Sequence, residues 1–126
     1  MIAPRTLVLF DVDGTLIDSQ VHILEAMEVA FSVQGLSLPS REEVLSIIGL
    51  SLFEAFEQLC PGADDAQRAA LVANFKKSFS ILRHTMGPSP LYPGALACLD
   101  LLKGVEHLVL GIATGKSRRG LDYVLS

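Results

Sequence analysis

The sequence predicts an α/β fold in which an all-helical module is inserted into part of a parallel sheet. Two short apolar runs, residues 6–10 and 107–113, each pass directly into a polar loop that contains glycine. Runs that are apolar on both faces are typical of buried parallel strands, and ligands bind at the carboxyl ends of such strands. Between the runs, apolar residues recur at helical spacing, which indicates an α/β core interrupted by helices.

Local signals define the expected elements in order. The first strand, residues 6–10, ends where Asp11 begins a polar loop. Ser19 is a candidate N-cap for a helix over residues 21–33, and Gly35 ends that helix. Capping-box patterns and aspartates begin the helices that follow. These later helices cover residues 44–48 after Ser40, 53–59 after Ser51, 64 or 65 to about 84, 95–103, and a segment after Ser117.

Prolines separate the helical stretch from the rest of the chain. Pro88, Pro90 and Pro93 make the connection before the last helices stiff and rich in turns. We therefore expect residues 1–18 and 90–126 to form a partial α/β core. Residues 19–89 are expected to form the helical module.

Composition narrows the class of protein. The 126 residues allow one small domain, and 10 Lys plus Arg against 14 Asp plus Glu give a net charge of −4. A protein with a pI near 5.2 is not built to bind nucleic acid through its charge. The mean hydropathy is +0.44, but charges, Gly or Pro interrupt every long apolar stretch, so no membrane partner is expected. Cys60 and Cys98 lie far apart and no signal peptide is recognisable, which excludes a disulfide scaffold and favours the cytoplasm.

Residues 11–16, Asp-Val-Asp-Gly-Thr-Leu, are the most informative stretch. Two carboxylates two positions apart at a strand end can both approach a bound group once the strand yields to a loop. Gly14 allows backbone geometry that a side chain would block. One carboxylate can act as a nucleophile and the other as an acid or base, and together they can hold Mg²⁺ through oxygen ligands.

Two other interpretations of this stretch are a solvated turn and a calcium-binding loop. A calcium loop that begins at Asp11 needs a Glu at its twelfth position, which is His22 here. Leu16 and Ile17 are also unsuitable neighbours for a calcium ion. The calcium interpretation is therefore rejected, whereas the solvated turn stays open on these residues alone.

Residues 11–19, Asp-Val-Asp-Gly-Thr-Leu-Ile-Asp-Ser, resemble the first motif of the haloacid dehalogenase-like hydrolase superfamily. Thr-Gly-Lys at residues 114–116 resembles its second motif. The helical module lies where the phosphoglycolate phosphatase-like subfamily has its cap, and residues 92–95 are similar to the segment that re-enters the core there. The resemblance implies a Rossmann-like core, of which this chain holds the N-terminal part, with residues 19–89 as an inserted all-helical cap.

The resemblance also implies roles for four residues. Asp11 would be the nucleophile that forms an aspartyl-phosphate, and Asp13 would act first as an acid and then as a base. Mg²⁺ would bind the Asp11 carboxylate and the Asp13 backbone carbonyl. The Thr114 hydroxyl and the Gly115 amide would hold phosphate oxygens. The branch that cleaves carbon–halogen bonds lacks the second aspartate, so Asp13 argues against dehalogenation.

Several other side chains receive structural interpretations. Lys116 could pair with phosphate but is predicted as a surface lysine, and Asp18 and Ser19 are predicted as a hinge and a helix cap. The three histidines show no metal-ligand spacing. The core of the cap is predicted to contain Met27, Phe31, Phe53, Phe56, Phe75 and Phe79.

The chain ends at Ser126, just after the second motif. The family pattern continues with a lysine and with a strand whose acidic residues complete the Mg²⁺ site. Three explanations stay open: a fragment of a longer phosphatase, a chain that depends on a partner or on self-association, and an inactive vestigial chain. We expect little phosphatase activity from these 126 residues alone.

The leading functional hypothesis is a Mg²⁺-dependent phosphatase that acts on a small phosphorylated metabolite. A sugar phosphomutase on the same scaffold is a rival, because it would return the phosphoryl group to its substrate rather than to water. A non-catalytic binding module is the second class, since an incomplete site could still bind phosphate or Mg²⁺. An exposed strand edge could also recruit a partner.

Overall fold

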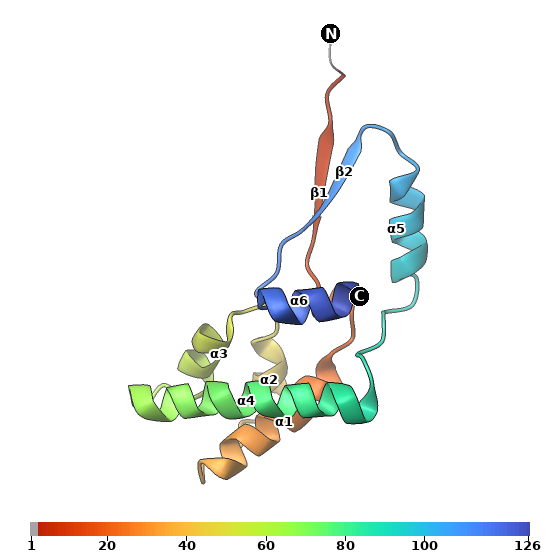
Figure 1. The fold of residues 1–126 in the computed structure, drawn as a ribbon. Helices are drawn as coiled ribbons and strands as arrows, with labels where there is room; N and C mark the ends of the chain where they lie inside the picture. The colour runs from red at the N-terminus through yellow and green to blue at the C-terminus, as the bar shows by residue number, and fades with distance from the viewer. Residues whose placement is uncertain (1–2) are drawn as a thin grey trace.

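The computed structural model describes residues 3–126 (Figure 1). Met1 and Ile2, which belong to the expected core segment 1–18, lie outside the described residues. Figure 1 shows a small sheet with a helix beside it at one end of the molecule and a group of helices at the other, with the C-terminal helix between them.

The sheet consists of β1 (Thr6–Phe10) and β2 (Leu108–Ile112), which pair in parallel. The register places Phe10 opposite Ile112, and the Ala113 amide donates a hydrogen bond to the Phe10 carbonyl oxygen over 2.9 Å. The prediction of two parallel strands is confirmed. Because the two strands end at the same level, the loops that follow them lie next to each other.

The prediction that both strands are buried on both faces is wrong. Leu7 and Leu9 of β1 are 59% and 57% exposed. Within residues 3–126 the sheet has two strands, and α5 (Ala95–Lys103) packs against β2. Two strands and one helix supply too few side chains to cover both faces of the sheet, so alternate strand residues stay in contact with water.

The remaining helices lie close to their predicted positions. They are α1 (Gln20–Val33), α2 (Arg41–Ser46), α3 (Leu52–Leu59), α4 (Asp65–Met86) and α6 (Arg118–Leu125). Ser40 with Glu43, and Asp64 with Gln67, form complete capping boxes, which explains why α2 and α4 begin where they do. In the part of the chain that the structure describes, no helix is long and apolar enough to cross a membrane.

Helices α1 to α4 enclose the hydrophobic core of the molecule. Its largest fully buried side chains are Phe31, Phe56, Met27, Leu71 and Val44. The Phe56 ring contacts the rings of Phe31 and Phe75, with centroids 6.1 Å apart in each pair. Phe53 is 58% exposed, so its predicted place in this core is wrong. Ala55 and Phe56 occupy the inward face of α3, which leaves Phe53 at the edge of that face.

The two segments that connect the sheet with α1–α4 run side by side. The Asp18 amide donates a hydrogen bond to the Pro90 carbonyl oxygen over 2.8 Å, and the Tyr92 amide donates one to the Leu16 carbonyl oxygen over 2.9 Å. These bonds fix the attachment of the helical group beside the loop that follows β1. That loop carries the paired aspartates.

Candidate active site

The loop after β1 is folded around one carbonyl group. The Val12 carbonyl oxygen accepts hydrogen bonds from the amides of residues 15–17 over 2.9 to 3.2 Å. Gly14 has a φ of 82°, in the left-handed region that a side chain would strain. This turn holds Asp11 and Asp13 at the carboxyl end of the sheet.

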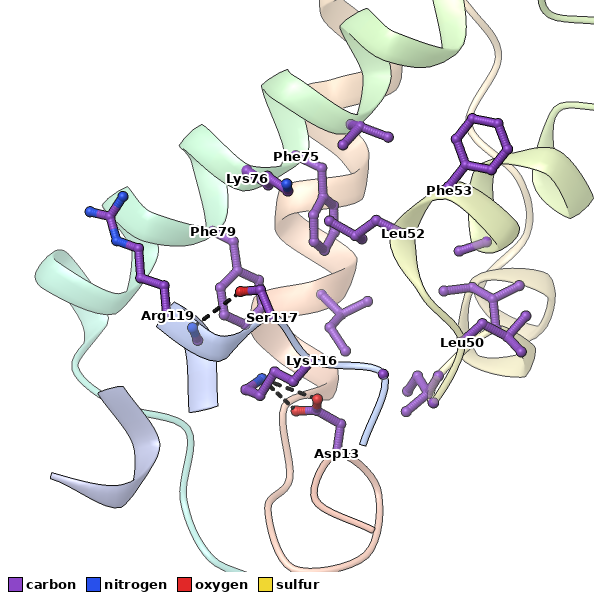
Figure 2. Close-up of a pocket in the computed structure, with 18 of the residues that line it drawn as sticks. Asp13, Leu50, Leu52, Phe53, Phe75, Lys76, Phe79, Lys116, Ser117 and Arg119 are labelled. Carbon is purple, nitrogen blue, oxygen red and sulfur yellow. Dashed lines mark hydrogen bonds and ion pairs between the residues drawn. The ribbon is translucent and has the colours of Figure 1, made fainter. Parts of the chain in front are cut away.

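The Asp13 carboxylate is held from two directions. Lys116 Nζ donates to both carboxylate oxygens over 3.0 Å each, as Figure 2 shows, and the Ser19 hydroxyl donates to Oδ1 over 2.9 Å. The side chains of Asp13 and Lys116 are 16% and 12% exposed. Charge-assisted hydrogen bonds are among the strongest in proteins, so this pair ties the loop after β1 to the loop after β2.

These contacts correct two predictions. Ser19 lies at the N-cap of α1, but its side chain makes no capping hydrogen bond, because it is buried and bonded to Asp13 instead. Lys116 is not a surface lysine, because Asp13 holds its ammonium group inside the molecule. The Lys116 Nζ also lies 5.5 Å from the centroid of the Phe79 ring, which adds a cation–π contact.

Asp11 lies directly after β1 with one carboxylate oxygen engaged. Its Oδ1 accepts a hydrogen bond from the Val12 amide over 2.8 Å. No hydrogen-bond donor to its Oδ2 is found within residues 3–126. A Cβ added to Gly49 would lie 3.8 Å from that Oδ2. The loop between α2 and α3 therefore comes close to the free oxygen of Asp11.

The loop after β2 brings Thr114 and Gly115 to the same place. The Thr114 hydroxyl oxygen accepts a hydrogen bond from the Lys116 amide over 3.1 Å, which leaves the hydroxyl hydrogen available to another acceptor. A Cβ added to Gly115 would lie 2.7 Å from the Gly49 carbonyl oxygen and 3.0 Å from Leu50 backbone atoms. Close packing therefore requires glycine at position 115, a constraint that the sequence alone did not reveal.

A cavity of about 620 Å³ opens between the loop after β2 and helices α3 and α4 (Figure 2). Asp13, Gly115 and Lys116 line it, whereas Asp11 and Thr114 do not. The structure thus places all four residues of the expected site at the two strand ends, but only Asp13 and Gly115 face the cavity. Lys116 and Ser19 are the site residues that sequence reasoning missed.

The family model described as "Haloacid dehalogenase-like hydrolase" matches residues 8–126. The chain belongs to this family. The match includes both strand-end loops and all six helices described above, so the expected family and its partial α/β core are confirmed.

Curated relatives and solved structures extend the comparison. The "Probable phosphatase IndB" of Dickeya dadantii (strain 3937) is 33% identical over 113 residues, which are 89% of this chain and 49% of that protein. "Pyrophosphatase PpaX" of Bacillus pumilus (strain SAFR-032) is 40% identical over 113 residues, 88% of this chain and 48% of that protein. This chain spans about half the length of these relatives. The crystal structure of a hydrolase from Pseudomonas syringae superposes on this chain with a TM-score of 0.80 at 24% sequence identity. The match covers 98% of this chain and 54% of that hydrolase, and it shows a shared fold.

Asp11 and Asp13 offer oxygen atoms of the kind that can bind a metal ion. Within residues 3–126 no group of three or more His, Cys, Asp or Glu side chains is placed to hold a metal ion. The Asp11 carboxylate and the Asp13 backbone carbonyl are hard oxygen donors, the type that Mg²⁺ prefers. The Asp11 Oδ2 also gives up no hydrogen bond within the described chain when it binds a cation. The two residues therefore fit Mg²⁺ as part of its ligand set.

The tight contact at Gly115 yields a prediction about stability. We expect Gly115→Ala to lower the free energy of unfolding by about 1–3 kcal/mol, because the added methyl group meets backbone atoms of residues 49–50 that cannot rotate away. Urea denaturation followed by circular dichroism measures the change. Gly62→Ala is the matched control, since nothing lies within 4 Å of an added Cβ there. Equal stabilities of the two variants would contradict the close contact.

Proposed function

We propose that this protein hydrolyses phosphomonoesters, with Asp11 as the nucleophile and Asp13 as the acid and base. The observation that carries the proposal is the convergence of two loops at the ends of adjacent parallel strands. Asp11 and Asp13 follow β1, and Thr114 and Gly115 follow β2. Membership of a hydrolase family and the phosphatase names of its relatives support the proposal.

The proposal also divides the chain into two parts. Residues 1–18 and 90–126 belong to the catalytic core, and residues 19–89 form the cap that covers the strand ends. The separate hydrophobic core of α1–α4 supports this division. So do the paired crossings between core and cap at Asp18 and Pro90.

The reaction takes place in two steps. An Asp11 carboxylate oxygen attacks the substrate phosphorus, the bond from phosphorus to the ester oxygen breaks, and Asp13 gives its proton to the departing alkoxide. The phosphoryl group is then bound to Asp11 as an aspartyl-phosphate. Water attacks the phosphorus, Asp13 takes a proton from that water, and the bond between phosphorus and Asp11 breaks. Inorganic phosphate leaves, and both aspartates return to their starting states.

Ser19 and Lys116 orient Asp13 for this work. Both donate hydrogen bonds to the carboxylate oxygens, so they fix the position of the group that accepts a proton from water in the second step. To act as the acid in the first step, Asp13 must carry a proton, which weakens its attraction to Lys116. An incoming phosphate is a second acceptor for the same ammonium group. Substrate binding and protonation of Asp13 therefore both favour a movement of the Lys116 ammonium group away from Asp13 and toward the phosphate.

The negative charge of the phosphoryl group is met by hydrogen-bond donors and a cation. The Thr114 hydroxyl and the Gly115 amide donate to phosphoryl oxygens, and stabilisation of this kind is a large part of phosphoryl-transfer catalysis. The Asp11 carboxylate and the Asp13 carbonyl would hold Mg²⁺. When bound, Mg²⁺ offsets the repulsion between an anionic nucleophile and an anionic substrate.

The proposed substrate is a small phosphorylated metabolite of the cytoplasm. A net charge of −4 disfavours nucleic acid as a partner. Self-association stays a proposal that fits the exposed leucines of β1.

The test is Mg²⁺-dependent phosphate release by the protein as its gene encodes it. Inorganic phosphate and remaining substrate are measured for a panel of phosphomonoesters, with Mg²⁺, with a chelator, and after Mg²⁺ is restored in excess. We expect phosphate release in the first and third conditions only. Conversion of a sugar phosphate to its isomer without phosphate release would favour the phosphomutase. No conversion of any phosphomonoester would refute the proposed function.

A further inference from the structure

We propose that the cavity beside Asp13 binds the organic part of the substrate and that this part carries an aromatic ring. The inference rests on the proposed phosphatase function and specifies its substrate class. It is carried by the side chains that line the cavity between the strand-end loops and helices α3 and α4.

The cavity begins at the catalytic groups. Asp13, Gly115 and Lys116 line it at the strand ends, so a phosphate held by these residues lies beside this space. Figure 2 shows Asp13 and Lys116 on one side of the cavity, with the side chains of α3 and α4 across from them. The alcohol part of a bound phosphomonoester can therefore extend into the cavity.

Three phenylalanine side chains line the cavity among aliphatic ones. Phe75 and Phe79 lie one turn apart on α4, with their ring centroids 5.7 Å apart, and Phe53 lines the same cavity from α3. Figure 2 shows Phe75 and Phe79 extending from α4 into the space that Leu52 borders from the other side. Aliphatic side chains complete the wall. They outnumber the rings and include Ile48, Leu50, Leu52 and Val72.

Lys116 joins the phosphate end of the cavity to its aromatic wall. Its Nζ lies 3.0 Å from the Asp13 carboxylate and 5.5 Å from the centroid of the Phe79 ring. The Lys116 side chain therefore contacts both the Asp13 carboxylate and the Phe79 ring. When Lys116 turns to a bound phosphate, that ring face becomes available for an aromatic group of the substrate, because rings pair favourably at centroid distances of about 4.5–7 Å.

The size of the cavity argues against a very small alcohol part. The cavity of about 620 Å³ lies within the range of pockets that hold ligands of drug-like size, and a two-carbon acid would leave most of its wall in contact with water. Arg83 faces the cavity, but its guanidinium is stacked between the rings of Phe79 and Tyr123, at 5.4 and 4.4 Å from their centroids. Lys76 and Arg119 also line the cavity, but both residues are exposed. Phe53 is 58% exposed at this site, and an aromatic ligand would cover it.

The experiment compares four probes on the protein as its gene encodes it. Benzyl phosphate and cyclohexylmethyl phosphate have similar leaving groups and sizes, so their ratio isolates the aromatic ring. 2-Phosphoglycolate represents a small acidic ester, and inorganic phosphate represents the phosphate site alone. Dissociation constants are measured by calorimetry on Asp11→Asn, which leaves the esters intact, and kcat/KM is measured on the unaltered protein. We expect benzyl phosphate to bind about tenfold tighter than 2-phosphoglycolate and severalfold tighter than cyclohexylmethyl phosphate.

Two variants test whether the preference for benzyl phosphate comes from the aromatic rings that line the cavity. Phe79→Leu and Phe53→Leu keep apolar volume but remove a ring, and each should reduce the preference for benzyl phosphate about three- to tenfold. Phe53→Leu should also leave the affinity for inorganic phosphate unchanged, because the ring that contacts Lys116 is that of Phe79. Leu101→Ala, on the exposed side of α5, should change neither value. Hydrolysis of all three esters with no aromatic preference, or with a preference that both ring variants keep, overturns the inference alone. Failure to bind or hydrolyse any probe overturns the proposed function and the inference with it.

Discussion

Replacement of Asp11 by asparagine is expected to abolish phosphate release and to leave the fold unchanged. The amide has no charged oxygen to attack phosphorus, so kcat/KM should fall by on the order of 10⁴-fold or more. The asparagine side-chain oxygen can still accept the Val12 amide hydrogen bond, which now reaches Asp11 Oδ1 over 2.8 Å. Phosphate release and thermal unfolding are measured side by side on the same preparations.

Asp18→Asn is the matched control for this experiment. Asp18 follows the same strand, and its carboxylate accepts a hydrogen bond from the Gln20 amide over 3.3 Å outside the cavity. This variant should keep its activity within about twofold, because it removes one charge without touching the reacting groups. Activity that survives in Asp11→Asn would show that Asp11 is not the nucleophile, and an equal loss in Asp18→Asn would show that the effect is not specific to Asp11.

The sequence predicted most of the fold because its elements carry strong local signals. The helix over residues 95–103 was located at its observed bounds, and the Ser40 capping box begins α2 as expected. Parallel pairing followed from two short apolar runs joined through helices, since parallel strands need a crossover. Such signals depend on neighbours within a few residues along the chain, so they can be recognised without the tertiary structure.

The details of the site could not be predicted in this way, because they depend on contacts between distant segments. Lys116 has the local sequence of a solvated lysine, and its role comes from Asp13 in another loop. Ser19 satisfies the pattern of a helix cap, but the Asp13 carboxylate accepts the hydrogen bond of its hydroxyl instead. For Gly115, the motif indicated a phosphate contact, and only the structure shows the backbone of residues 49–50 packed against it.

The second large effect is expected in the core of α1–α4. We expect Phe56→Ala to lower the free energy of unfolding by about 3–5 kcal/mol, because it leaves a cavity between the rings of Phe31 and Phe75. Phe53→Ala, three residues earlier on the same helix, removes an equal side chain that is 58% exposed. Phe53→Ala should lower the free energy of unfolding by less than about 1 kcal/mol. This figure includes the loss of the contact between the Phe53 ring and Arg68. Urea denaturation of both variants gives the comparison.

The pair also tests whether the helical core supports the site. Residues 49–50 come immediately before α3 and touch Gly115, so a loosened α3 should free the loop that packs against the end of β2. Phe56→Ala should therefore weaken the binding of inorganic phosphate at urea concentrations at which the protein is still folded, whereas Phe53→Ala should not. Equal destabilisation by the two substitutions would mean that α3 does not pack through Phe56. Unchanged phosphate binding in a destabilised Phe56→Ala would mean that the strand-end loops keep their shape without the cap.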